Sequence, residues 1–590
     1  MTTVAPTSLT VEGRELVQDF LTEQRRMTAV DRFSQRYDHD DADGGAPAQA
    51  RYYRDLIPLA KPEAGQQYAF EVDLDACSGC KACVSACHNL NGLDEGETWR
   101  EVGQLVSGPL DDLLPGALAD EHGASSKLET GNSKLETTIL QHITTACHHC
   151  LEPGCLEGCP VKAYDKDPVT GIVKHLDDQC IGCQYCVFKC PYDVPKYHKG
   201  KGIVRKCDMC SDRLAEGEAP ACAQACPTQA IRIRIVDVDE VRADATAGRF
   251  LPASPSPADT KPTTRYRTRR DLAGARAADA HRLEAEHAHL PLVIMLVLTQ
   301  LAVGGYLIGA IIEWLTAGAL FEPVRSLHAT LTLVFAVVAL GASTLHLGRP
   351  MYAFRAVLGL RTSWLSREIV SFGGFAKLAF AYAGVSWFAA DMFDGVLVRG
   401  LAVMVAVSGL AGVFCSVMIY VDTPRPFWRA SDTGPKYLLT MLILGAAVTL
   451  LSGGAVAAGS STVTFYELMA GWGRPLCLLL AGLTLLKLAW EARVLLALRD
   501  IEQTPMKRSA RLLVGPLARV TFTRTLTGLA GGVALPLLLV QSTSDPAAPP
   551  PAFLTIIGIA FVLLLVGELL ERYLFFSAVS ALKMPGGLHA

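Results

Sequence analysis

Sixteen of the eighteen cysteines in this chain lie between Cys77 and Cys226, in four groups whose spacing is that of metal ligands. The third group, CIGCQYCVFKCP, begins at Cys180; its gaps are two, two and three residues long, and proline follows the last cysteine. This is the spacing of bacterial ferredoxins, in which three cysteines of a short loop bind one [4Fe–4S] cluster and the fourth binds another. The pattern therefore predicts one-electron transfer.

The other three groups vary the same pattern. The second and fourth groups lengthen one gap, and His88 takes the place of proline after the first group. Because no group lacks a cysteine, the chain has ligands for four clusters. The alternative is zinc, since paired C-x2-C units also form four-cysteine zinc sites. The candidate ligands are Cys77, Cys80, Cys83 and Cys87, then Cys147, Cys150, Cys155 and Cys159, then Cys180, Cys183, Cys186 and Cys190, and finally Cys207, Cys210, Cys222 and Cys226.

The 590 residues divide into a polar half, 1–285, and an apolar half, 290–590. A net charge of −4 gives no reason to expect nucleic acid as a partner, and the first residues lack the apolar stretch of a secretory signal. A membrane-spanning helix needs about 20 mostly apolar residues. The apolar half contains eight such runs, at about 291–318, 327–347, 365–389, 396–420, 437–458, 475–498, 524–542 and 552–576.

These patterns predict an α+β ferredoxin-like iron–sulfur domain followed by an all-α bundle of eight transmembrane helices. We expect a partner-docking arm at 1–65, a four-cluster domain at 66–247, a proline-rich and basic linker at 248–289 and a membrane anchor at 290–590. The alternative for the arm is a helix that covers its own domain.

Lysine and arginine mark the cytoplasmic loops of membrane proteins. Here they concentrate in the loops after the second, fourth and sixth runs, whereas the other loops hold little beyond Arg325 and Arg474. This predicts a multi-pass protein of the plasma (inner) membrane. Its iron–sulfur domain and both termini are expected in the cytoplasm.

Both halves resemble subunits of the same enzymes. Residues 66–235 resemble the four-cluster iron–sulfur subunit of molybdopterin oxidoreductases of the dimethyl sulfoxide reductase type, on the segments YAFEVDLDACSGCKAC, NGLDEGETWREVG, CHHCLEPGC and KCDMCSDRL. The second half resembles their membrane anchor, a relative of polysulfide reductase anchors, on HLPLVIMLVLTQLAVGG, STLHLGRPMYAFRAV, SWLSREIVSFG and VDTPRPFWRASDTGP. The chain therefore looks like a fusion of two neighbouring subunits.

The resemblance, and not the spacing, implies which cysteines share a cluster. The first group pairs with the fourth, and the second with the third. We name the four resulting sets of ligands quartets A to D. Quartet A is Cys77, Cys80, Cys83 and Cys226; quartet B is Cys87, Cys207, Cys210 and Cys222; quartet C is Cys147, Cys150, Cys155 and Cys190; quartet D is Cys159, Cys180, Cys183 and Cys186.

A quinol site is also implied by the resemblance, at His346 of the HLGRP segment. A quinol releases two protons with its two electrons, and a histidine suits that proton transfer. Glu368 is a second candidate for proton transfer, and Arg349 a candidate for holding a quinone oxygen. The structural alternatives are that His346 caps its helix and that Glu368 pairs with Arg367 or Arg349.

Haem is not expected. The two histidines within the apolar runs, His328 and His346, are 18 residues apart on one helix, about 27 Å at 1.5 Å per residue. The expected function is electron transfer between membrane quinol, expected to be menaquinol, and a molybdopterin catalytic subunit. The favoured direction is quinol oxidation. The alternatives are a quinone-reducing subunit of a dehydrogenase and a proton-translocating module.

Overall fold

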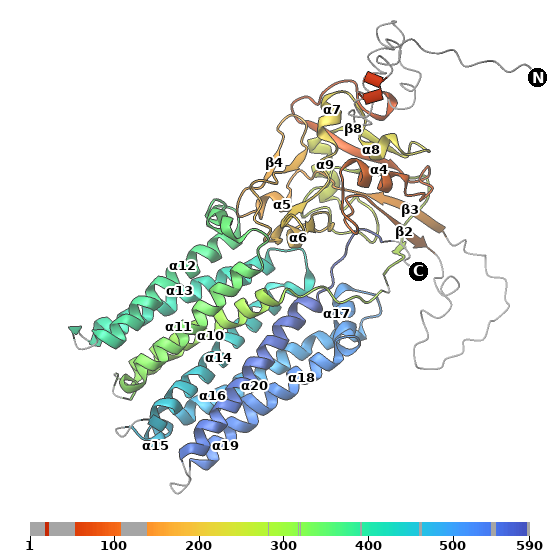
Figure 1. Ribbon diagram of the computed structural model, residues 1–590. Coiled ribbons are helices and arrows are strands. Elements are labelled where there is room, and N and C mark those ends of the chain that lie inside the picture. Colours follow the sequence, from red (N-terminus) through yellow and green to blue (C-terminus); the bar gives the residue numbers. More distant parts are fainter. Residues whose placement is uncertain are drawn as a thin grey trace, which may run out of the picture.

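The computed structural model describes residues 18, 19, 21, 22, 54–107, 139–280, 282–316, 318, 320–389, 392, 393, 395–459, 463–543 and 550–586. A mixed α+β half stands on one end of a long helical bundle (Figure 1). This is the predicted fold class. Most of the predicted arm at 1–65 lies outside the described residues.

Two three-stranded sheets and two hairpins form the iron–sulfur half. In the first sheet, β1 pairs with β8 and β9; in the second, β2 pairs with β3 and β10. The alternation in IRIRIV explains β8, because Ile231 and Ile233 are fully buried while Arg232 and Arg234, at the alternate positions, are partly exposed. The strands are β1 (Gln66–Asp73), β2 (Glu101–Ser107), β3 (Ile139–Thr145), β4 (Tyr164–Lys166), β5 (Val173–His175), β6 (Lys196–His198), β7 (Ile203–Arg205), β8 (Ile231–Asp237), β9 (Arg265–Arg267) and β10 (Arg276–Ala277).

Short helices hold the cysteine groups. The contacts between α4 and α8, and between α5 and α6, bring the first group to the fourth and the second to the third. The helices of this half are α4 (Ala82–Leu90), α5 (Gly154–Glu157), α6 (Tyr185–Lys189), α7 (Ser211–Ala215), α8 (Ala221–Gln224) and α9 (Val238–Thr246).

The segment at 248–289 is more than the linker expected from its prolines. It contributes β9, which pairs parallel with β1, and β10, which pairs antiparallel with β2. These strands are three and two residues long, too short to give a periodic pattern in the sequence. The iron–sulfur half therefore extends through this segment to the first membrane helix.

The second half is a bundle with eight helical spans long and apolar enough to cross a membrane, counted over the described residues. Each predicted apolar run overlaps one of them. The sixth span, Phe465–Arg499, and the seventh, Ala518–Ser542, each contain a π turn. The helices are α10 (Leu290–Leu315), α11 (Glu322–Leu345), α12 (Trp364–Phe388), α13 (Gly395–Val421), α14 (Ala430–Gly459), α15 (Phe465–Leu468), α16 (Arg474–Ala492), α17 (Pro505–Val514), α18 (Ala518–Gly528), α19 (Leu535–Ser542) and α20 (Pro550–Ser577).

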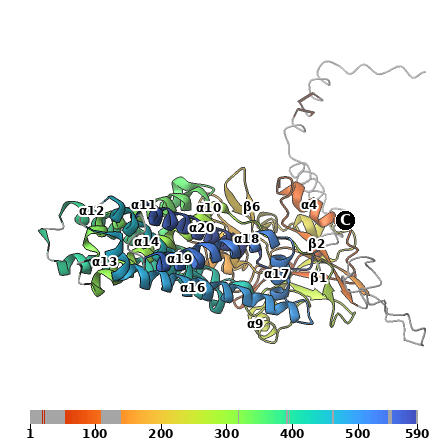
Figure 2. The same ribbon diagram turned by 90° about the horizontal axis from the view of Figure 1, so that it is seen from below.

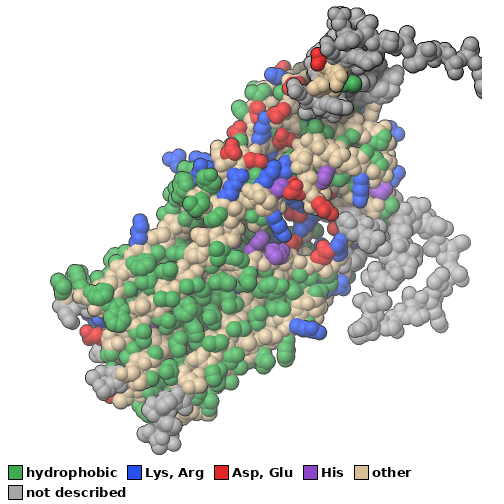
Figure 3. Space-filling view, viewed as in Figure 1, with side chains coloured by type: hydrophobic (Ala, Val, Ile, Leu, Met, Phe, Trp, Pro, Cys, Tyr) green, Lys and Arg blue, Asp and Glu red, His purple; other side chains and the backbone are tan. Residues whose placement is uncertain are grey.

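Surface chemistry separates the two halves. In Figure 3 hydrophobic side chains cover the visible face of the bundle, and charged ones gather on the iron–sulfur half and where the two halves meet. Seen from below, the helices run together away from the sheets (Figure 2). An apolar band of this kind faces lipid, so the bundle spans the membrane and the iron–sulfur half lies at its surface.

The C-terminal tail, Val579–Gly586, returns from α20 to the iron–sulfur half. The amide of Gln104 in β2 donates a hydrogen bond to the carbonyl of Gly586 at 3.0 Å. Lys583 forms ion pairs with Glu286 at 2.8 Å and with Asp193 at 3.5 Å. The tail therefore joins the end of the last helix to the second sheet.

Candidate functional site

Quartets A, C and D each surround one small cavity. The cavity of quartet D is lined by Cys159, Cys180, Cys183 and Cys186 and by no other cysteine. Quartets C and A line two further cavities in the same way, with Cys147, Cys150, Cys155 and Cys190 around one and Cys77, Cys80, Cys83 and Cys226 around the other. In each set three cysteines share one loop and the fourth comes from a distant group, so the fold brings together the groupings that the resemblance implied.

The pKa shifts of two quartet B cysteines show that the members of this quartet lie close to one another. Burial, with Cys222 and Cys210 nearby, raises the pKa of Cys87 to about 12. Burial also raises the pKa of Cys207, with Cys147 of quartet C and Cys87 among its neighbours. Cys87 of the first group therefore lies among cysteines of the fourth group.

The loops that carry the cysteines curl by means of left-handed residues. Gly79 (φ +73) and Gly182 (φ +70) stand immediately before the second cysteine of their loops. Lys81 (φ 62) and Gln184 (φ 60) follow that cysteine in each loop. Since glycine adopts positive φ without strain, this repeated geometry turns successive thiols toward one interior point.

Backbone amides face the sulfurs. Ala163 N–H donates to Cys159 Sγ at 3.2 Å, and Gly182 N–H donates to Cys180 Sγ at 3.4 Å. Amides that point at sulfur are what cysteine-ligated clusters need, because they stabilise thiolate charge and tune the potential. The donor set therefore fits iron–sulfur clusters.

The donors do not fit a single metal ion. Within the described part of the chain, no group of three or more histidine, cysteine, aspartate or glutamate side chains is arranged to hold one. Zinc would draw four sulfurs to about 2.3 Å from one centre. Thiols placed around a cavity suit a cubane, in which each cysteine binds a different iron.

The loop of quartet D touches the membrane half directly. The amide of Arg349 donates to the carbonyl of Ile181 at 3.0 Å. A Cβ at Gly348 would lie 2.0 Å from the carbonyl oxygen of Gly202, which shows that the two backbones are in contact. Tyr185, between two ligands of quartet D, donates its hydroxyl to the carbonyl of Ile419 in α13 at 3.2 Å. Quartet D is therefore the set of ligands next to the membrane.

His346 ends α11 on this side of the bundle and is partly buried. Its Nδ1 lies 2.6 Å from the carbonyl oxygen of Ser343, so Nδ1 carries the hydrogen and Nε2 is the acceptor in the neutral ring. The helix-capping contact considered from the sequence is present. It leaves Nε2 as the atom that can receive a proton.

Glu368, near the start of α12, is 3% exposed. Its carboxylate accepts a hydrogen bond from the hydroxyl of Ser416 in α13. The alternative that it pairs with Arg367 or Arg349 is wrong. Arg367 donates to the carbonyl of Arg361 at 2.7 Å, and Arg349 points into the iron–sulfur half.

Arg349 binds the iron–sulfur half. Its guanidinium donates to the carbonyl of Asp177 at 2.9 Å and to that of Lys201 at 3.3 Å. No described hydrogen bond or ion pair joins Arg349, His346 and Glu368 to one another. The segment between His346 and Glu368 covers the loop of quartet D, so the two proton-transfer candidates flank the same contact.

Comparison with known families agrees with both halves. The family model described as "4Fe-4S dicluster domain" matches residues 139–235. The one described as "DMSO reductase anchor subunit (DmsC)" matches residues 283–578, half of the chain. The chain belongs to the dimethyl sulfoxide reductase anchor family, with an iron–sulfur subunit fused to it.

Relatives of the iron–sulfur half include the B subunit of the anaerobic dimethyl sulfoxide reductase of Escherichia coli (strain K12), 32% identical over 171 residues, which are 29% of this chain and 75% of that protein. The B subunit of the same enzyme from Haemophilus influenzae is 30% identical over 192 residues, 32% of this chain and 84% of the relative. The iron–sulfur subunit of the nitrate-inducible formate dehydrogenase of E. coli is 37% identical over 179 residues, 29% of this chain and 57% of the relative. This member of the anchor family is thus an electron-transfer iron–sulfur protein and a multi-pass membrane anchor of a molybdoenzyme.

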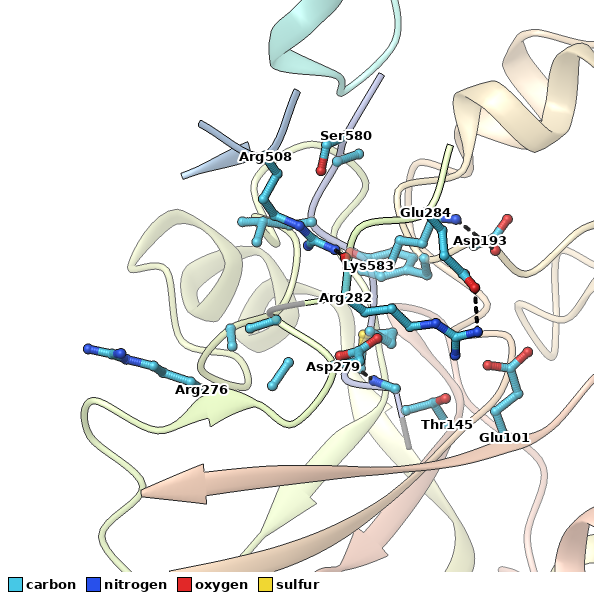
Figure 4. A pocket seen from close by; sticks show the side chains of 18 of the residues that line it. Glu101, Thr145, Asp193, Arg276, Asp279, Arg282, Glu284, Arg508, Ser580 and Lys583 are labelled. Atoms are coloured by element: carbon cyan, nitrogen blue, oxygen red, sulfur yellow. Dashed lines mark hydrogen bonds and ion pairs between the residues drawn. The ribbon is translucent and has the colours of Figure 1, made fainter. Parts of the chain in front are cut away.

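A cavity of about 1010 Å³ lies where the iron–sulfur half, the segment at 248–289 and the C-terminal tail meet (Figure 4). Arg282 points to Glu284, Lys583 points to Asp193, and Arg276 points away from them. None of His346, Glu368 and Arg349 lines this cavity. Its charged walls suit water and ions rather than an apolar quinone ring.

A buried ion network crosses α16, α18 and α20, and sequence reasoning did not assemble it. Arg524 donates to Glu491 at 3.0 Å and to Glu568 at 2.9 Å, and Lys487 pairs with Glu568. Lys487 and Glu568 stand out in the sequence as charges within apolar runs, but only the packing of the helices shows that they meet. The members are Lys487, Glu491, Arg524, Glu568, Glu571 and Arg572.

Two further charges in the spans have different surroundings. Glu313 of α10 pairs with Arg325 of α11 at 2.7 Å and accepts a hydrogen bond from Tyr382 at 3.1 Å. Lys377 is exposed on the surface of α12. The ring nitrogens of His328 each lie 2.9 Å from an oxygen, that of Ser452 and that of the Gly305 carbonyl, so this histidine serves packing between helices.

Proposed function

We propose that the chain oxidises quinol, menaquinol by our expectation, at the membrane surface and passes the electrons singly through four [4Fe–4S] clusters to a molybdopterin catalytic subunit. The observation that carries this proposal is the contact between the loop of quartet D and the segment that follows α11. One set of four cysteines lies directly against the membrane half at this contact. Electron transfer needs such proximity between donor and acceptor.

The clusters would be held by quartets A to D. The bound clusters supply the one-electron chemistry, and the chain supplies thiolates and amide hydrogen bonds. Burial raises the pKa of Cys190 to about 12 and that of Cys210 to about 11. Both thiols therefore carry protons until iron binds, and cluster assembly releases them.

Electrons would enter at quartet D and leave at quartet A. Cys80 of quartet A is exposed, whereas Cys180 and Cys186 of quartet D are buried. The catalytic subunit is thus expected to dock around Cys80. The lysines and arginines in the loops after the second, fourth and sixth spans favour a cytoplasmic location for the iron–sulfur half.

Quinol oxidation would use His346 and Glu368 for proton transfer. Oxidation of one quinol gives one quinone, two electrons and two protons, and a cluster held by quartet D would accept the electrons one at a time. The acceptor Nε2 of His346 receives one proton, and the buried carboxylate of Glu368 receives the other. Arg349 would act by holding the cluster loop, because its guanidinium is occupied by two carbonyls of the iron–sulfur half.

The test uses detergent-solubilised full-length protein with bound clusters. When a quinol is added, it should reduce the clusters of His346→Ala and of Glu368→Gln about a hundredfold more slowly than those of wild type. Dithionite should still reduce both fully, which shows that the clusters are intact. Leu345→Ala, next to His346 and 76% exposed, is the matched control. Wild-type rates in both variants would contradict the proposed site, and iron-free wild-type protein would contradict the proposed function.

Proton translocation is a second candidate, supported by the buried ion network. Buried ionisable side chains in membrane helices are costly and mark proton routes in many transporters. The guanidinium of Arg572, fully buried, also donates to Gln300 of α10 at 3.2 Å, so the network reaches the centre of the bundle. Quinol oxidation in proteoliposomes that contain a trapped pH dye tests this function. Proton movement that Lys487→Met abolishes without slowing electron transfer would favour it.

A further inference from the structure

Two buried cations lie between the cysteine quartets. Lys206 is 3% exposed and Arg100 is 2% exposed. Neither forms an ion pair with a carboxylate anywhere in the described chain. A buried charge without a partner is strongly unfavourable, so these two positions require negative charge from another source.

Lys206 lies between quartets B and C. Its Nζ is 3.7 Å from Cys147 Sγ of quartet C and donates to the carbonyl of Cys207, a member of quartet B, at 2.8 Å. It also donates to the carbonyl of Val173 in β5. Asp208 is close in sequence, but its carboxylate accepts the amide of Cys210 at 2.9 Å.

Arg100 lies between quartets A and B. Its Nη1 donates at 3.1 Å to the hydroxyl of Thr144, which is 3.5 Å from Cys83 Sγ of quartet A. Burial lowers the pKa of Arg100, but negative charge at Cys222 of quartet B and at Cys83 of quartet A raises it overall. The guanidinium stacks over the ring of Phe70 at 4.6 Å, and its Nε and Nη2 have no hydrogen-bond partner.

The surroundings of quartet D differ. Lys189, on the helix that carries Cys186, pairs with Asp422 at 2.8 Å. His175, beside Cys180, pairs with Asp177 at 2.8 Å. Each of these groups has a carboxylate of its own, so it adds no unpaired positive charge at quartet D.

We propose that Lys206 and Arg100 set the reduction potentials of the clusters they separate, Lys206 for quartets B and C and Arg100 for quartets A and B. The inference rests on the proposed function, because it assumes a cluster at each quartet. Each step adds one electron to an oxidised cluster and moves no proton. A fixed positive charge nearby stabilises the reduced cluster more than the oxidised one, so it raises the potential.

The test is a redox titration of the purified holoprotein followed by electron paramagnetic resonance. In Lys206→Met the equilibrium constant for reducing the clusters of quartets B and C should fall about tenfold or more, which is about 59 mV for a one-electron couple. The clusters of quartets A and D should titrate as in wild type. Arg100→Gln should lower the reduction potentials of the clusters of quartets A and B and leave that of quartet D unchanged.

Two controls separate charge from structure. Lys206→Arg keeps the charge and should keep the potentials near those of wild type. Lys174→Met removes an equal charge from β5, where the side chain is 38% exposed and 3.8 Å from Asp212, and should change nothing.

Unshifted potentials in Lys206→Met and Lys206→Gln would overturn the inference. The inference would also be wrong if both neutral variants lost some clusters and the remaining clusters kept their wild-type potentials. The lysine would then hold the clusters in place without affecting their potentials. Wild-type protein without iron would instead overturn the proposed function.

Discussion

The contact between Gly348 and Gly202 offers a direct test of how the two halves are joined. In Gly348→Ala the added methyl would begin 2.0 Å from the Gly202 carbonyl oxygen, whereas ordinary contact begins at 3.4 Å. The two backbones must therefore retreat by 1.4 Å. Overpacking of this kind costs about 1–3 kcal/mol, which weakens docking of the cluster loop by about 5- to 150-fold.

Two measurements report on the weakened contact in Gly348→Ala. Hydrogen exchange should rise in the segment between α11 and α12, and quinol should reduce the clusters more slowly because quartet D moves away from the membrane half. Gly341→Ala is the matched control, since it makes the same change nearby, in the last turns of α11, with nothing within 4 Å of the new methyl.

The outcomes are distinct. Normal exchange and a normal reduction rate in Gly348→Ala would refute the reasoning that this contact holds quartet D in place. Equal slowing in both variants would show a general effect of the added methyl on this part of the chain rather than an effect on the contact. Slowing in Gly348→Ala alone is the expected result.

Further variants test other parts of the structure. Cys183→Ser should remove about four irons per chain and leave the remaining resonance signals in place; loss of all signals would contradict separate sites. Glu313→Gln leaves Arg325 buried without its carboxylate and should destabilise the bundle by about 3–5 kcal/mol, measured by thermal unfolding, with recovery when Arg325→Met is added. Lys583→Met should raise hydrogen exchange in the C-terminal tail and cost less than about 1 kcal/mol, because the side chain is 40% exposed. Burial lowers the pKa of Lys583, but Asp193 and Glu286 together raise it above its usual value, so this tether is complete at neutral pH and weakens only as pH rises through the raised value.

Much of the fold could be predicted because its signals are local. Four-cysteine spacing and runs of about 20 apolar residues are complete within short windows, so the cluster loops and all eight spans lie where the sequence places them. The helices differ from the predicted runs mainly at their ends. The alternation in IRIRIV accounts for β8 in the same local way.

The remaining features depend on contacts between distant segments. Spacing alone cannot show that Cys190 faces Cys147 across 43 residues; the resemblance implied it. The partners of Arg349 are carbonyls at Asp177 and Lys201, and carbonyls leave no mark in a sequence. Arg100 and Lys206 look like surface charges until tertiary packing buries them.

The C-terminal tail has a consequence for biogenesis. The ribosome makes the cysteine loops first and Val579–Gly586 after all eight spans, yet β2 has its full set of neighbours only when this late segment arrives beside Gln104. This contact of β2 can therefore form only after the last span has been made. A polypeptide cut before α20 would leave the amide of Gln104 without this partner, while β3 and β10 would still flank β2.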